Sequence, residues 1–502
     1  MFLAKNIKNN LLLRISFYTL VMIPAIMIFV EKIKSNKFNV DEFQHTYLAW
    51  STAFYHHLQY RDMWDNHGIL YTVFNSLVLG IFKPVVGVPA LMLERYANLV
   101  ILVIGFYILQ EIFYQISSKF YSASLGAWIF AFSMLSVKGI EIRPDNLQCL
   151  FLYSALLLLF RAFKINSLRL IFFSGFFISL MLMTNLKSVS ALMAVSTGLL
   201  IICFRRGNFK FLANWVFGLV LGLVIFALAF WSLGIFDDYI KQNFLYNLIT
   251  SHKYPNTSNL EKVLNFFLHD SYFISLIVMG SIVIFGAEFL WRKNFLKKSF
   301  EPNLIILLIF FVCLLSRFTV YIYRLQFDLM YFPLACCVSS YVFWKIFDLG
   351  FSRTLKLTLL VICFFAFGFL GFDLINKSRE EKSAHNFYLD IFQQRFLDIN
   401  NFLKDDEYLD YYTLDNCPGF GFRKNSEVLF FKYKNSMLAF EDLEQKEIFG
   451  ASYINRLNSK KVKIIIGTPK GIYDIPYAET RDYILKNYKH YGCVWERVTP
   501  FR

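Results

Sequence analysis

Two acidic residues, Asp41 and Glu42, follow the first long apolar segment, and the triplet Arg143-Pro144-Asp145 stands at the mouth of a later one. A carboxylate can take the proton of an attacking hydroxyl group, and an arginine can bind a phosphate through its planar guanidinium group. The stretch from Tyr60 to Gly68, which contains His67, is also dense in polar side chains. Because charges beside hydrocarbon are costly and mark functional sites, this pattern predicts a membrane enzyme or a transporter.

Apolar segments occupy most of the rest of the chain. Hydrophobic residues make up 57% of the sequence and the mean hydropathy is +0.46, so most of the chain is suited to lipid. A helix that crosses a membrane needs roughly 20 apolar residues. The first apolar segment has no small-residue cleavage site after it and is predicted to be a retained anchor. The segments of suitable length predict about 11 transmembrane helices: Ile15–Val30, Tyr96–Ile116, Ser122–Val137, Leu147–Phe163, Leu168–Thr184, Ser188–Phe204, Phe211–Phe236, Ser271–Trp291, Leu304–Val320, Leu325–Phe347 and Thr354–Leu374.

The net charge of +15 indicates membrane topology rather than nucleic-acid binding. Basic residues gather before the first span and in four later loops, around Arg161, Arg205, Arg292 and Arg353. Loops rich in Lys and Arg stay in the cytoplasm, which places the N-terminus inside and the loop 31–95 outside. The same count puts Asp145, Lys187 and everything after Leu374 outside. The apolar run Ile69–Val86 should then lie in the interface, or dip in and return, rather than cross. We expect a multi-pass protein of a bacterial-type inner (plasma) membrane.

Residues 376–502 differ from the apolar part, because they are rich in charge, Asn and Tyr and contain no spanning run. Lys461–Gly467 is predicted to be a buried strand, Ala478–Tyr488 a helix and Cys493–Val498 a second strand. These elements predict a small extracytoplasmic α/β domain after a transmembrane domain at 1–375. Cys417 and Cys493 both lie there, and an oxidising compartment would allow them to form a disulfide. The other six cysteines lie in or beside apolar runs, where a packing role is expected.

The order of the polar motifs resembles the GT-C membrane glycosyltransferases, above all the branch containing the protein O-mannosyltransferases and the lipid A aminoarabinose transferases. That family shows an acidic pair after the first span, a His-Pro-Pro-Leu-like stretch, an Arg opening the next span and an Ala-Arg-Pro-Asp-like turn. The matching residues here are Asp41-Glu42, Asn66–Tyr71, Arg95, Ile142–Asp145, Lys187 and Arg324 with Pro333. Gly68-Ile69 replaces the Pro-Pro pair. This departure bears on which subfamily the chain resembles and on the shape of the interfacial helix.

The resemblance implies a polytopic α-helical membrane protein of GT-C type, with interfacial helices and a small C-terminal α/β domain. It implies transfer of a hexose or pentose from a polyprenyl-phosphate donor to a lipid, glycan or protein acceptor. Asp41 would be the general base, and Glu42 and Asp145 would orient the sugar or the acceptor. The substrate-binding candidates, mostly cations for the donor phosphate, are Arg95, Arg143, Lys187, Arg324 and His67. No cofactor is expected to be required; the alternative is a divalent ion bound by Asp41, Asp145 and His67.

Other interpretations of these residues remain open from the sequence. The acidic pair can cap a helix that starts near Phe43, and Arg143–Asp145 can be a structural turn before the next helix. Arg95, Lys187 and Arg324 can be interfacial side chains that extend toward water. The alternative function is a transporter or flippase of a lipid-linked sugar, for which repeated broken helices would be expected. A non-catalytic membrane scaffold is a third class, which leaves the clustered acids unexplained.

Overall fold

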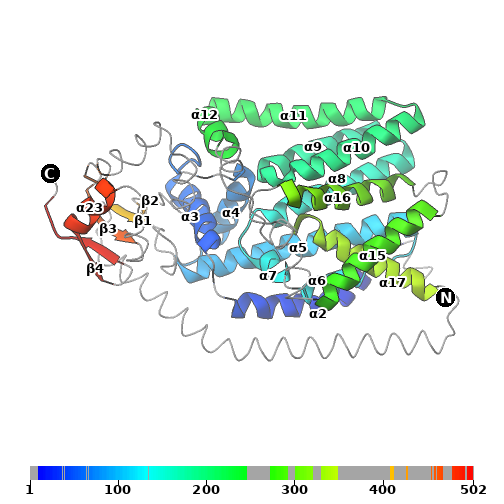
Figure 1. Ribbon diagram of the computed structural model, residues 1–502, viewed down its shortest axis with the longest axis horizontal. Helices are drawn as coiled ribbons and strands as arrows, with labels where there is room; N and C mark the ends of the chain where they lie inside the picture. Colours follow the sequence, from blue (N-terminus) through cyan, green and yellow to red (C-terminus); the bar gives the residue numbers. More distant parts are fainter. Residues whose placement is uncertain are drawn as a thin grey trace.

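Apolar helices account for most of the chain that the computed structural model describes (Figure 1). The described part comprises residues 10–36, 38, 40–63, 65, 67–133, 135–245, 272–291, 300–319 and 329–348, followed by 408–411, 426–427, 454, 457–458, 461–466, 478–491 and 494–500. The predicted span Thr354–Leu374, the candidate Arg324, and both Cys417 and Cys493 lie outside these residues.

The chain is a polytopic α-helical membrane protein. Among the described residues, the helices long and apolar enough to cross a membrane are α2 (Leu11–Ser35), α5 (Val88–Ser117), α8 (Asp145–Ile165), η1 with α10 (Leu186–Ser188 and Val189–Arg206) and α11 (Lys210–Ser232). Further apolar helices are α9 (Leu168–Thr184), α15 (Tyr272–Trp291), α16 (Phe300–Thr319) and α17 (Phe332–Asp348). Side-chain caps open α2, α9 and η1, since Asn10, Ser167 and Asn185 accept hydrogen bonds from main-chain N–H groups in the first turn of each.

The predicted single span over Ser122–Val137 is wrong, because two short helices replace it. They are α6 (Gly126–Ala131) and α7 (Leu135–Ile140). The ammonium group of Lys32, on α2, donates to the main-chain oxygens of Ala131 and Ser133 and to the hydroxyl of Ser136. A break in a membrane helix is tolerated where other protein groups satisfy the freed backbone, and Lys32 does this here.

The external loop of the sequence prediction contains two helices that pack on each other, α3 (Val40–Tyr55) and α4 (Ile69–Phe82). In Figure 1 they lie together at the end of the bundle where α8 begins and α9 ends, close to the short helix α12 (Phe236–Tyr239). With 14 residues, α4 is about 21 Å long, shorter than the ~30 Å hydrocarbon layer. This length fits the expected interfacial position, which stays a prediction.

Close helix packing in the bundle depends on glycines that face neighbouring backbones. A Cβ atom on Gly175 of α9 would overlap the main-chain oxygen of Trp215, and one on Gly218 of α11 would overlap that of Phe172. The contact is reciprocal, so α9 and α11 touch backbone to backbone. Small residues allow this approach in membranes, where dispersion and packing rather than the hydrophobic effect hold helices together.

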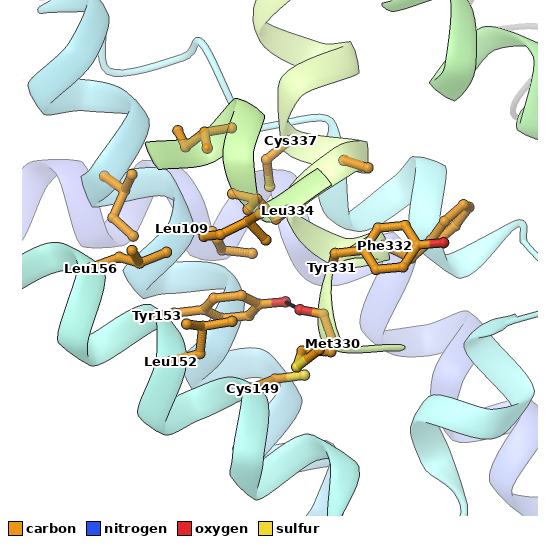
Figure 2. Close-up of a cluster of buried hydrophobic side chains, with 14 of the residues drawn as sticks. Leu109, Cys149, Leu152, Tyr153, Leu156, Met330, Tyr331, Phe332, Leu334 and Cys337 are labelled. Atoms are coloured by element: carbon orange, nitrogen blue, oxygen red, sulfur yellow. Dashed lines mark hydrogen bonds between the residues drawn. The ribbon is translucent and has the colours of Figure 1, made fainter. Parts of the chain in front are cut away.

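The core between α8 and the start of α17 joins segments that are far apart in the sequence (Figure 2). Tyr153 donates its hydroxyl to the main-chain oxygen of Met330 at 3.3 Å, and the thiol of Cys149 reaches that of Leu329 at 3.3 Å. These polar groups satisfy the backbone just before α17 begins. The described cysteines of the bundle are all buried, in line with the packing role expected of them: Cys149, Cys203, Cys313, Cys336 and Cys337.

A small mixed sheet lies near the C-terminus, as the sequence predicted. Its strands run in the order β2-β1-β3-β5-β4, with parallel pairing of β1 to β2 and β3, and antiparallel pairing of β5 to β3 and β4. The predicted elements are found as β3 (Val462–Ile466), α23 (Ala478–Asn487) and β5 (Val494–Arg497); the remaining strands are β1 (Tyr408–Tyr411), β2 (Ser426–Glu427) and β4 (Tyr488–Tyr491). The domain boundary at residue 376 stays a prediction.

The glycine contacts lead to a stability prediction. We expect Gly218→Ala to push α11 away from α9 and to destabilise the protein by about 1–3 kcal/mol, as overpacking does elsewhere. Gly280→Ala is the matched control, because a Cβ atom on Gly280 of α15 would meet nothing within 4 Å. Thermal unfolding in detergent should show a lower midpoint for Gly218→Ala only. Equal midpoints for the two variants would contradict the backbone contact.

Candidate active site

Most of the candidate residues that the structure describes lie at the end of the bundle formed by α3, α4 and the adjoining turns. Asp41 is in the first turn of α3, Arg143 directly precedes α8, and Asp145 is the first residue of α8. Lys187 is in η1, the turn between α9 and α10. Because α8 begins and α9 ends at this end of the bundle (Figure 1), antiparallel packing brings these turns next to α3.

Glu42 and Arg95 form a fully buried ion pair with each other. The Arg95 Nε and Nη2 atoms donate to the two Glu42 oxygens at 2.7 and 2.6 Å. The Arg95 Nη1 atom donates to the main-chain oxygens of Ile33 and Asn36 at 3.0 and 2.7 Å. One Glu42 oxygen also accepts from the Ile142 main-chain N–H at 3.1 Å. The pair therefore joins the end of α2, α3, α5 and the segment before α8, and neither side chain is exposed to a substrate in this structure.

Arg143 lies between two carboxylates. Its Nη2 atom is 2.7 Å from Asp41 Oδ2, and its Nε atom donates to Glu141 Oε2 at 2.6 Å. Burial on its own would lower the pKa of Arg143, but the negative charges of Asp41, Glu141 and Asp145 outweigh it and raise that pKa. The guanidinium group therefore stays charged. The side chain of Asp41 is 23% exposed and that of Arg143 is 8% exposed, so Asp41 is the more accessible member of this pair.

Asp145 has one occupied and one unoccupied carboxylate oxygen. Its Oδ1 atom is 3.6 Å from the Lys187 ammonium group. Its Oδ2 atom is buried and has no hydrogen-bond partner. A buried acceptor without a partner typically costs about 1–3 kcal/mol, and a hydroxyl group of a bound molecule could satisfy it. Lys187 is 22% exposed, so both the lysine and the free oxygen can take part in binding.

His67 belongs to a separate polar cluster between α3 and α4. Its Nδ1 atom is 2.8 Å from Asp65 Oδ1, and the Asp65 carboxylate also accepts from Gln44 Nε2 at 3.1 Å and from Gln59 Nε2 at 2.8 Å. The ring of His45 lies 4.8 Å from that of His67. Burial lowers the pKa of His45 to about 3, so its imidazole is neutral at physiological pH.

Gly68 lies where the structure leaves no room for a side chain. A Cβ atom at this position would overlap the main-chain oxygen of Met183, at the end of α9. The chain after His67 therefore lies directly on the backbone that leads into η1 and Lys187. A glycine allows this approach, because any side chain would push the two segments apart.

The structure thus forms two ion pairs among the candidates, Asp41 with Arg143 and Asp145 with Lys187. A third pair, Glu42 with Arg95, is fully buried. His45 stands four residues after Asp41 on the same face of α3, and its ring contacts that of His67, so the His67 cluster is near Asp41. Among the described residues, the group placed to hold a metal ion is His45, Asp65 and His67; of the three residues considered for a metal from the sequence, it contains only His67.

Sequence reasoning gave no role to Glu141, Asp65 or His45. Glu141 stands two residues before Arg143, and Asp65 two residues before His67, a spacing that puts side chains on the same side of an extended segment. This spacing was the available signal for the first two residues. His45 lies on a helix, and its distance of more than twenty residues from His67 hides the contact in the sequence.

Comparison with known proteins identifies the fold. No protein-family model matches the sequence, and no curated protein sequence matches it. ArnT from Cupriavidus metallidurans bound to undecaprenyl phosphate matches with a TM-score of 0.58 at 9% identity, over 91% of this chain and 94% of that one. The oligosaccharyltransferase AglB from Archaeoglobus fulgidus, in complex with an inhibitory peptide and a dolichol-phosphate, gives a TM-score of 0.51 at 11% identity, over 97% and 75%.

The apo form of the Archaeoglobus fulgidus oligosaccharyltransferase matches at a TM-score of 0.46 and 12% identity, over 72% of this chain and 56% of that chain, which is little more than half of its length. ArnT and AglB are both GT-C glycosyltransferases. The chain therefore has the GT-C fold, which confirms the fold that the motif order predicted.

The buried pair gives a stability prediction. Removing one partner should leave an uncompensated charge, so Arg95→Met and Glu42→Gln should each destabilise the protein by about 3–5 kcal/mol. Unfolding in detergent measures the effect. Arg61→Met is the matched control, because Arg61 pairs with Asp62 at an exposed position and should change the unfolding midpoint little. Near-equal midpoints for Arg95→Met and Arg61→Met would show that the buried pair does not hold the site together.

Proposed function

We propose that this protein is a glycosyltransferase that moves a sugar from a polyprenyl-phosphate donor to an envelope acceptor on the outer face of the membrane. The observation that carries the proposal is the set of Asp41, Arg143, Asp145 and Lys187, charged side chains gathered at one end of a GT-C fold. ArnT and AglB, which share this fold, were solved with undecaprenyl phosphate and dolichol-phosphate respectively. The outer face is supported by the loop charges, which place all four residues there.

Asp41 is the proposed general base. A sugar phosphate already carries a good leaving group, so the acceptor hydroxyl is the group that needs help, by loss of its proton. Asp41 is the more exposed member of its ion pair, so its carboxylate is the one that an acceptor hydroxyl can approach. The unpartnered oxygen of Asp145 is suited to accept a hydrogen bond from a hydroxyl of the sugar or the acceptor.

Lys187 and Arg143 are the proposed cations for the donor phosphate. Negative charge grows on the phosphate as the sugar leaves, and cations placed beforehand stabilise it most in the transition state. The Lys187 side chain is 22% exposed and lies 3.6 Å from Asp145, so a phosphate can approach its ammonium group. Arg95 and Glu42 are proposed to hold the site in shape rather than to contact substrate, because both are fully buried and bind each other.

A flippase of a lipid-linked sugar is the second candidate, and the break between α6 and α7 favours it. Discontinuous helices often form the binding sites of transporters. Here Lys32 occupies the freed carbonyl groups, which leaves the break filled by protein. Purified protein given a polyprenyl-phosphate sugar separates the candidates: release of polyprenyl phosphate indicates transfer, whereas counterflow without release indicates transport. Mass spectrometry of envelope lipids and glycans with and without the gene would identify the sugar and the acceptor.

Loss of the Asp41 charge should abolish most of the activity. Asp41→Asn keeps the size of the side chain and should slow release of polyprenyl phosphate by roughly 10²-fold or more, the usual contribution of a general base. Asp237→Asn, at an exposed position of α12, is the matched control and should act like the wild type. Right-side-out vesicles should show the activity with donor added outside. Wild-type rates for Asp41→Asn would assign the base to another group.

Binding of the donor phosphate should depend on Lys187 and Arg143. Loss of a hydrogen bond to a charged group costs about 1.5–3 kcal/mol, so Lys187→Gln should weaken polyprenyl-phosphate binding about 10- to 100-fold, and Lys187→Arg should retain most of it. Arg143→Lys should also weaken polyprenyl-phosphate binding. A single ammonium group cannot replace a guanidinium group that contacts Asp41 and Glu141 together. Titration of labelled polyprenyl phosphate measures the affinity, and unchanged affinity in both Lys187→Gln and Arg143→Lys would remove the proposed anion site.

A further inference from the structure

We propose that His45, Asp65 and His67 form a binding site for a divalent metal ion of the zinc type. Their potential ligand atoms, two imidazole nitrogens and a carboxylate oxygen, all lie within 4.8 Å of one another. Two histidines with one carboxylate are a donor set that zinc uses in proteins, with the fourth position left to water or to another ligand. The site is distinct from the ion pairs of Asp41 and Asp145 and does not depend on the proposed transfer reaction.

The cluster needs little rearrangement to hold an ion. The His67 Nδ1 and Asp65 Oδ1 atoms are 2.8 Å apart. Ligand bonds of about 2.0–2.2 Å to one zinc ion require a separation only slightly larger. The ring of His45 meets His67 edge-on at 4.8 Å and Tyr71 at 5.3 Å. These contacts fix the orientation of the His45 ring.

Two glutamines give an independent sign of a missing ligand. Gln44 and Gln59 are 3% and 2% exposed, and both donate their amide N–H groups to Asp65. Their amide oxygens are buried and have no hydrogen-bond partner. A buried acceptor without a partner is unfavourable. Rotation of either amide would turn its oxygen toward the cluster, where it could fill the fourth position. The other amide would keep Asp65 oriented through its hydrogen bond.

The elements that carry these ligands suggest what an ion would do. His45 comes from the middle of α3, whereas Asp65 and His67 come from the segment that leads into α4. One ion would therefore fasten that segment to α3. Since His45 stands four residues after Asp41 on the same face of α3, the ion would stiffen the wall of the candidate active site and add positive charge beside it.

Metal binding can be tested on the full-length chain without any substrate. Purified protein in detergent is stripped with a chelator, reloaded with zinc chloride or cobalt(II) chloride, freed of excess metal and analysed by elemental mass spectrometry and visible absorption. We expect a single equivalent of zinc per chain and the intense visible bands of four-coordinate cobalt. Isothermal titration with zinc chloride then gives the affinity.

Variants separate a built site from adventitious binding. Loss of a side chain that orients a metal ligand usually weakens metal affinity about 10- to 100-fold, so we expect Gln59→Leu to fall in that range. The ligand variants His67→Gln and Asp65→Asn should lose at least as much affinity. His56→Gln is the matched control, because His56 is exposed and outside the cluster. Circular dichroism and gel filtration confirm that each variant folds. A wild type that retains no metal, or variants that all bind as His56→Gln does, would overturn the proposal.

Discussion

The buried pair of Arg95 and Glu42 is the interaction on which the rest of the site depends. Taking two charges out of water costs several kcal/mol per ion, and the pair repays this only with good geometry and further hydrogen bonds. Here the bonds include two between the partners, two from Arg95 to the end of α2, and one to Glu42 from the backbone before α8. The pair therefore fixes four segments that no local interaction could align.

The position of the exposed charges follows from this pair. Glu42 is the neighbour of Asp41 on α3, so a Glu42 side chain bound to Arg95 sets the rotation of the first turn that carries Asp41. The same carboxylate binds the Ile142 N–H, which sets the position of Arg143 one residue later. The contact between Asp41 and Arg143 thus rests on two segments held by one buried carboxylate, and Gly68 brings the segment after His67 against the end of α9 in a similar way.

Much of the fold could be predicted from composition and periodicity. The apolar runs predicted the bundle helices that the structure describes, and the pattern of residues 461–498 predicted two strands and a helix that are present. The prediction failed over Ser122–Val137, where apolar composition alone could not reveal a break. The break exists because the side chain of Lys32, about a hundred positions earlier, binds the freed carbonyl groups. Such a contact has no local signal.

For the candidate site, too, one part could be predicted from the sequence and another part could not. The sequence by itself determined which charged residues stand near membrane boundaries, because charge beside lipid is costly and a run of apolar residues makes each exception visible. Only the tertiary structure decided their partners. It buried Arg95 against Glu42, left Asp41 partly exposed beside Arg143, and joined His45 on α3 to Asp65 and His67 beyond it. Pairing depends on distances between segments far apart in the chain, and residue types and spacing do not contain those distances.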